Sequence, residues 1–127
     1  MKNALTIDLE DWYQTADLGI DIKYWNTMDS RIEKSTCQIL DMLSESDTHA
    51  TFFVLGCIAQ KHPQLIREID DRGHEIACHS TWHKMIDTQT PDEFKNDVSF
   101  SKKILEDIIG KKVTMFRAPT WSINSKN

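Results

Sequence analysis

Cysteine pairs are missing from this chain. Its three cysteines, Cys37, Cys57 and Cys78, form no Cys-x-x-Cys motif, and their number is odd. Neither a disulfide framework nor a cysteine-based zinc cluster is indicated. We expect reduced, partly buried thiols of the kind found in a reducing compartment.

Long apolar runs and an excess of positive charge are also missing. No stretch reaches membrane-spanning length, and residues 1–7 lack the apolar core of a secretion signal. We therefore expect a cytoplasmic protein with no membrane partner. A formal net charge of -5 argues against nucleic acid as a main partner. The chain has no repeat, low-complexity tract or linker, and 127 residues are enough for one small domain.

Strand-like and helix-like segments alternate along the chain. Short β-prone runs at 4–7, 50–55, 75–78 and 112–116 predict four strands. Segments with helical spacing lie between them, at 30–46, 58–72 and 90–109, whereas 14–26 shows no clear period and predicts a loop or insertion. This alternation is typical of an α/β fold with parallel strands and crossover helices.

Local signals predict where several helices begin and end. Ser30 and Glu33 match a capping box, and Thr90 with Glu93 forms a second one. Pro63 should break or restart the helix predicted at 58–72. Gly110 follows the last helix, where a C-terminal cap is expected.

Chemically active side chains follow three of the predicted strands. His79 and His83 stand four residues apart, so on a helical turn both imidazoles would face one ion. Asp8, Glu10 and Asp11 end the first strand, where a bound cation would relieve their mutual repulsion. Taken alone, the histidine pair fits an ordinary surface or core pair equally well. Taken alone, the acidic segment fits a solvated turn equally well. Their convergence at the carboxyl ends of parallel strands favours a site.

Two histidines and a carboxylate would leave open positions on a divalent metal, and a second carboxylate could act as general base. Arg117, at the end of the fourth predicted strand, could pair with that base and hold it in place. By itself, Arg117 would fit a structural ion pair better than this role. Trp82 and Trp121 fit either core packing or a stacking wall for a sugar ring. Such a set suits hydrolysis of an amide or ester.

These segments resemble the polysaccharide deacetylase family, also called the NodB-homology or carbohydrate esterase 4 family. The resemblance rests on residues 6–11 (TIDLED), 79–83 (HSTWH) and 117–121 (RAPTW), with 50–56 (ATFFVLG) and 73–76 (GHEI) in support. The opening Asp-x-Glu-Asp-Trp is most similar to the bacterial branch tied to exopolysaccharide biosynthesis.

The resemblance implies a distorted (β/α) barrel and a metal-dependent hydrolase that removes N-acetyl groups from amino sugars of a polysaccharide or oligosaccharide. It also implies a divalent metal, with zinc preferred, bound by His79 and His83. Arg117 would orient the base, and the backbone N–H of Thr120 would help hold the oxyanion. Trp82 and Trp121 would contact the saccharide.

The acidic segment departs from the family, in which two aspartates are adjacent. We prefer Asp8 as base and Asp11 as metal ligand. Glu10 is the alternative ligand. If Glu10 and Asp11 replace the adjacent pair, Glu10 instead becomes the base.

The family's later motifs, including the Leu-x-His that supplies the catalytic acid, are not in residues 1–127. We therefore expect one incomplete domain, the N-terminal part of a longer enzyme, that is weakly active or inactive alone. Its open sheet edges predict self-association. The alternatives are a non-catalytic, metal-holding sugar-binding fragment and a hydrolase of another small amide.

Overall fold

Three parallel strands form the centre of the structure, a computed structural model that describes residues 3–125. The strands are β1 (Thr6–Leu9), β2 (Thr51–Val54) and β3 (Glu75–Cys78), in the order β1-β2-β3. Thr6 pairs with Thr51, and Thr51 pairs with Glu75. Strands β2 and β3 lie where the sequence predicts them, whereas β1 begins and ends two residues later than the predicted 4–7. The predicted parallel pairing is confirmed.

The fourth predicted strand, 112–116, is reduced to one bridge between Phe116 and Cys78. Two hydrogen bonds make that bridge: Cys78 N to Met115 O at 2.9 Å, and Arg117 N to Cys78 O at 3.0 Å. Further back, the backbone N–H of Val113 donates to the Glu106 carboxylate instead of to a strand carbonyl. The N–H of Val113 is therefore not available for the backbone hydrogen bonds that a longer fourth strand would make.

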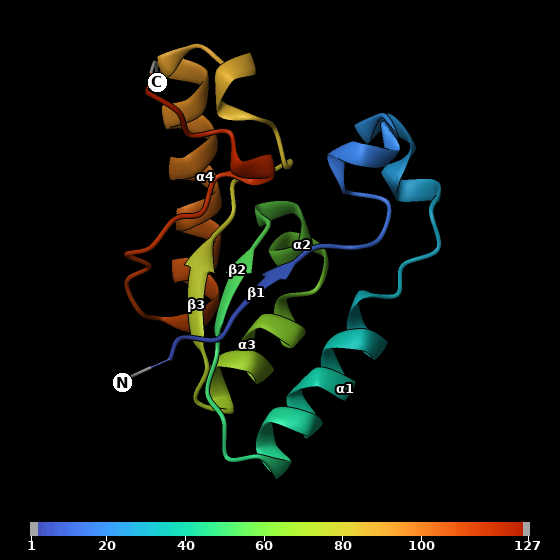
Figure 1. The fold of residues 1–127 in the computed structure, drawn as a ribbon, viewed down its shortest axis with the longest axis vertical. Coiled ribbons are helices and arrows are strands. Elements are labelled where there is room, and N and C mark those ends of the chain that lie inside the picture. Colours follow the sequence, from blue (N-terminus) through green and yellow to red (C-terminus); the bar gives the residue numbers. More distant parts are fainter. Residues whose placement is uncertain (1–2, 126–127) are drawn as a thin grey trace.

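Four α-helices connect or flank the strands: α1 (Ile32–Glu45), α2 (Gly56–Lys61), α3 (Pro63–Asp71) and α4 (Pro91–Ile109). Figure 1 shows α4 running alongside β3 while α1 lies on the other side of the molecule. Helices α2, α3 and α4 contact one another, and α3 and α4 also contact β3. Within residues 3–125, no helix is both long and apolar enough to cross a membrane.

The helix ends show which local signals were correct. The Thr90–Glu93 capping box forms, and Gly110 closes α4 in the left-handed conformation at φ 68°. The helix predicted at 58–72 is divided before Pro63, whose ring restricts the preceding residue. The Ser30–Glu33 capping box is wrong: α1 has no side-chain cap, because Ser30 Oγ donates to Asp11 instead.

A buried apolar core joins the sheet to its helices. Phe52 and Val54 of β2 pack with Leu40 of α1, Ile66 of α3 and Leu105 of α4, all fully buried. The predicted loop at 14–26 carries two short 3-10 helices, Ala16–Leu18 and Ile22–Thr27. This core fixes the strands relative to one another. The segments that follow the three strands therefore all start from the same edge of the sheet, the one formed by the carboxyl ends.

Candidate metal and catalytic site

The two histidines follow β3, but they are not on a helix. The chain passes through left-handed conformations at Ser80 (φ 67°) and His83 (φ 54°), which an α-helix does not contain. This corrects the predicted helical turn. The turn still brings the two imidazole centroids within 5.2 Å of each other, with His79 2% exposed. A loop with two left-handed residues, and not a helix, therefore brings the imidazoles of His79 and His83 together.

Helices α2 and α4 hold that loop in place. Gly56 N and Ser101 Oγ both donate to Ser80 O, at 2.9 and 3.0 Å. The Asp97 carboxylate accepts from Thr81 N at 3.2 Å, and Thr81 Oγ1 donates to Asp97 O at 3.0 Å. Asp97 and Ser101 belong to no sequence motif, and Gly56 was noted only as the end of the 50–56 segment, so the sequence analysis missed their role in holding this loop.

Glu10 joins the histidines. Among the described residues, Glu10, His79 and His83 each offer a ligand atom, and these atoms lie within 4.8 Å of one another. His83 Nε2 and Glu10 Oε2 are 2.9 Å apart, yet Glu10 Oε2 is buried without a hydrogen bond, as is His83 Nδ1. A buried acceptor without a donor is costly, and a shared cation would satisfy it. Two nitrogens and one oxygen suit zinc and similar divalent metals.

The tautomer of His79 is fixed by the backbone. Its Nδ1 lies 2.8 Å from Arg117 O, and because a carbonyl only accepts, Nδ1 carries the proton and Nε2 keeps its lone pair. Burial lowers the pKa of His79, which favours the neutral ring, and the nearby His83 lowers it further. The neutral form is the one that binds a metal.

Asp8 and Arg117 form an ion pair beside these groups. Arg117 Nη1 donates to Asp8 Oδ1 at 2.6 Å, and Nη2 donates to Thr6 Oγ1 at 2.8 Å. The guanidinium also lies 4.0 Å from the centroid of the Phe53 ring. The other oxygen, Asp8 Oδ2, is 3.9 Å from His79 Nε2. One carboxylate oxygen is thus held by arginine while the other faces the histidine.

Asp11 lies outside this cluster. It is 3% exposed, and its carboxylate accepts from Ser30 Oγ at 2.5 Å and from Arg31 N at 3.2 Å. Against our preference for Asp11 as metal ligand, the structure places Glu10 beside the two histidines and Asp11 away from them. Side chains alternate across a strand and its extension, so Asp8 and Glu10 share a direction that Asp11 does not.

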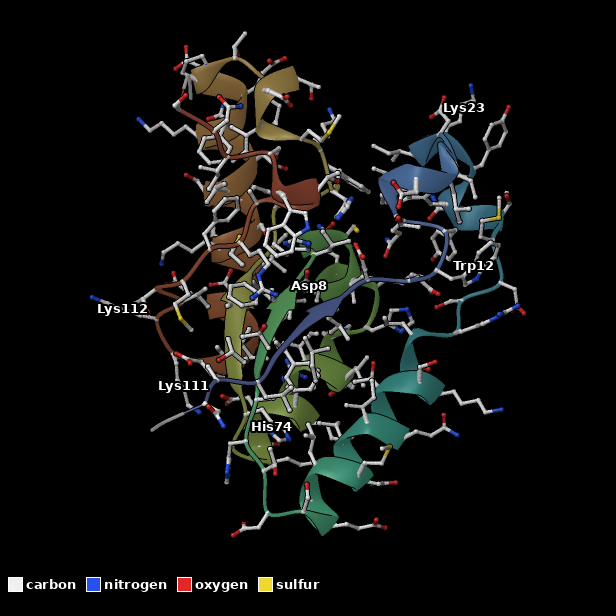
Figure 2. All side chains as sticks on the ribbon, in the orientation of Figure 1. Asp8, Trp12, Lys23, His74, Lys111 and Lys112 are labelled. Carbon is white, nitrogen blue, oxygen red and sulfur yellow. The ribbon has the colours of Figure 1, made fainter. Side chains whose placement is uncertain are left out.

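A hollow of about 290 Å³ gathers most of the candidate residues. Asp8, Glu10, both histidines and Arg117 line it, together with Thr120 and Trp121. Trp121 is 91% exposed, which rules out its core-packing alternative. Trp82 does not line this hollow. It packs on Trp25 with ring centroids 6.4 Å apart. Asp8 lies at the carboxyl end of β1, whereas His74 lies at the opposite end of the sheet (Figure 2).

The fold and the site define an α/β protein with a His₂-carboxylate cluster and an Asp–Arg pair at the carboxyl ends of parallel strands. The family model described as polysaccharide deacetylase matches residues 14–127, and the chain belongs to that family.

Several characterised relatives are bacterial deacetylases. The chain is 34% identical over 89 residues to a peptidoglycan-N-acetylglucosamine deacetylase of Bacillus cereus, covering 70% of this chain and 41% of the relative. It is 31% identical to the peptidoglycan-N-acetylmuramic acid deacetylase PdaA of Bacillus subtilis, covering 79% of this chain and 38% of the relative. The chain therefore spans less than half the length of these two curated relatives.

Solved structures confirm the fold class. The peptidoglycan deacetylase PdaC of Bacillus subtilis superposes with a TM-score of 0.75 at 29% identity, covering 97% of this chain and 51% of PdaC. A CE4 family pseudoenzyme of Bacillus anthracis superposes with a TM-score of 0.74 at 24% identity, covering 97% of this chain and 37% of that protein. This similarity concerns the fold alone. Because the fold also occurs in a pseudoenzyme, activity must be argued from the site.

Proposed function

We propose that this protein, in its natural length, hydrolyses N-acetyl groups on amino sugars of a polysaccharide. The observation that supports it best is the placement of Asp8 and Arg117 in the same hollow as Glu10, His79 and His83. This hollow combines a candidate metal site with a candidate base. The names of the relatives point to peptidoglycan, and the opening acidic segment favours an exopolysaccharide.

Each residue has a distinct task in this proposal. His79, His83 and Glu10 would hold a divalent metal, zinc by preference, and that ion would supply the Lewis acidity that activates water. Asp8 accepts the proton from the attacking water through Oδ2, the oxygen that Arg117 leaves unbonded. Arg117 keeps that carboxylate in position. The backbone N–H of Thr120, a residue that lines the hollow, would donate to the oxyanion formed from the acetamido carbonyl.

One alternative rests on a specific observation. Expulsion of an amine needs a proton donor, and no further histidine lines the hollow among residues 3–125. His62 pairs with Glu33, and His74 accepts from Ala50 N at the far end of β3. A sugar-binding module without hydrolysis is therefore the second candidate. It predicts saccharide binding with no release of acetate.

Acetate release and metal content separate these candidates. Asp8→Asn should lower acetate release from N-acetylated peptidoglycan or exopolysaccharide by on the order of 10²–10⁴ and leave the metal bound. Asp87→Asn, an exposed carboxylate outside the hollow, is the matched control and should change neither quantity. Full activity in Asp8→Asn would remove Asp8 from the reaction.

The metal site has its own test. The double variant His79→Ala, His83→Ala should lose the metal in elemental analysis, and Glu10→Gln should weaken its binding. Unchanged metal content in the double variant would refute the site. Loss of metal in Asp8→Asn, with retention in Glu10→Gln, would exchange the roles of Asp8 and Glu10.

A further inference from the structure

The two candidate histidine ligands are supported in different ways. His79 continues the β3 ladder, since its backbone N–H donates to Val54 O at 2.9 Å, and its ring Nδ1 donates to Arg117 O at 2.8 Å. The ring of His83 lacks such support. Its Nε2 lies 2.9 Å from Glu10, and its Nδ1 is buried with no hydrogen-bond partner among the described residues. A metal-binding histidine ordinarily has its second ring nitrogen fixed by a hydrogen bond, so another part of the structure must position His83.

The backbone around this ring is strained. In the histidine loop, which we define as residues 79–83, Ser80 and His83 have φ angles of 67° and 54°. A left-handed conformation is unfavourable for a residue with a Cβ atom, and it persists only where surrounding contacts impose it. Ser80 and Thr81 are each only 1% exposed, so their backbone groups also need partners inside the protein. The partners of Ser80 and Thr81 therefore determine the shape of the loop.

Helices α2 and α4 supply these partners. At the start of α2, the backbone N–H groups of residues 56 and 57 donate to Ser80 O and Thr81 O, at 2.9 and 3.2 Å. From α4, the Asp97 carboxylate accepts from Thr81 N, which lies 3.2 Å from each of its oxygens. One turn further along α4, Ser101 Oγ donates to Ser80 O at 3.0 Å. Residues four apart on a helix share a face, so α4 presents both side chains to the loop.

Thr81 is held through its N–H, its carbonyl and its hydroxyl, and the hydroxyl donates to Asp97 O at 3.0 Å. Because the carboxylate is charged, it holds the N–H more strongly than a neutral carbonyl would. Without Asp97, the buried N–H of Thr81 would lose its acceptor, and the loop would have to move to find another. His83 follows in the same loop, so its ring would move away from Glu10.

We propose that Asp97 and Ser101 are positioning residues for the metal site, which fix the histidine loop so that the ring of His83 meets Glu10 and His79. Neither residue lines the hollow of the candidate site, so each acts through the loop backbone. Because His79 has supports of its own, the effect passes mainly through His83. The inference rests on the proposed function for the presence of a metal, but not for the reaction.

The test is the zinc affinity of the protein in its natural length, measured by competition with a chromogenic chelator. Asp97→Ala should weaken zinc binding about 10–100-fold, the range typical of residues that orient metal ligands. Ser101→Ala should weaken it less, because a backbone donor to Ser80 O remains. Asp97→Asn keeps an acceptor oxygen and should restore most of the affinity. Asp107→Ala removes an exposed carboxylate near the other end of α4, and as the matched control it should bind zinc like the wild type.

A double-mutant cycle separates positioning from a plain loss of stability. In the His83→Ala background, Asp97→Ala should no longer change the residual zinc affinity, because the ligand that it positions is gone. A purely structural Asp97 would lower the urea midpoint of the metal-free protein and leave the zinc affinity of the folded protein unchanged. Zinc affinity equal to the wild type in both Asp97→Ala and Ser101→Ala would overturn the proposal, as would an equal loss with and without His83. If Asp97→Ala does not fold, the zinc affinity of Ser101→Ala decides.

Acetate release distinguishes this proposal from the proposed deacetylation. A wild type that binds zinc but releases no acetate, together with weaker zinc binding by Asp97→Ala, would support the positioning role and refute deacetylation. An Asp97→Ala protein with the zinc affinity and acetate release of the wild type would refute the positioning role alone. A wild type with no affinity for zinc would refute both.

Discussion

Replacing Asp11 by alanine should destabilise the fold without removing the metal. The buried carboxylate accepts hydrogen bonds from Ser30 Oγ and Arg31 N, just before α1, and from the backbone N–H of the adjacent Trp12. A hydrogen bond to a charged group contributes about 1.5–3 kcal/mol. Ser30 is half-buried and Arg31 is exposed, so water can replace part of each bond in the variant, and the lower end of that range applies. The two bonds to Ser30 and Arg31, which join the end of β1 to the start of α1, together give a loss of about 3 kcal/mol, and the local bond from Trp12 N is left out of this sum.

Urea denaturation of the metal-free protein, followed by tryptophan fluorescence, measures this loss. With a slope of about 2 kcal/mol per molar urea, the midpoint should fall by about 1.5 M. Asp11→Asn keeps an acceptor oxygen but loses the charge, so its midpoint should fall by less. Asp29→Ala, at an exposed position in the segment between β1 and α1, is the control and should denature like the wild type.

The metal content of the Asp11→Ala variant then decides whether Asp11 stabilises the fold or binds the metal. The variant should still bind one divalent ion, because the cluster contains Glu10 and not Asp11. An Asp11→Ala protein of normal stability that has lost its metal would overturn this reasoning. Asp11 would then return to the ligand set that the sequence analysis preferred.

Three further predictions concern residues outside the candidate ligand set. Burial, then the nearby charges of His49 and Arg72, lower the pKa of His74. The unfolded state therefore binds more protons, so the free energy of unfolding should fall as pH drops below about 6.5, and His74→Gln should flatten that dependence in urea titrations on either side of this pH. Thr90→Ala should cost about 1 kcal/mol through loss of the α4 cap, and Thr90→Ser should restore most of it, as thermal unfolding would show. Gly56→Ala would place a Cβ 2.9 Å from Ser101 Oγ and should destabilise by about 1–3 kcal/mol, with Ser101→Gly as a partial rescue. Equal stability of Gly56→Ala and the wild type would mean that α2 and α4 separate easily.

The strands and helices were largely predictable because their signals are local. Alternating β-prone runs and helical spacing located β1, β2 and β3, and Thr90 and Gly110 defined the ends of α4. The parallel order followed from the alternation itself. The prediction failed where a side chain from another element takes a hydrogen-bond donor that the predicted element needs. Glu106 takes the N–H of Val113, and Asp11 takes the hydroxyl of Ser30.

The sequence by itself determined which residue types the candidate site contains and which strand ends carry them. Tertiary structure decided which of those residues meet. Spacing along the chain cannot distinguish Glu10 from Asp11, because both follow β1 directly. Their opposite side-chain directions place one with the histidines and the other at the start of α1. The loop that pairs His79 with His83 depends on Gly56, Asp97 and Ser101, contacts between residues far apart in the chain that no local pattern encodes.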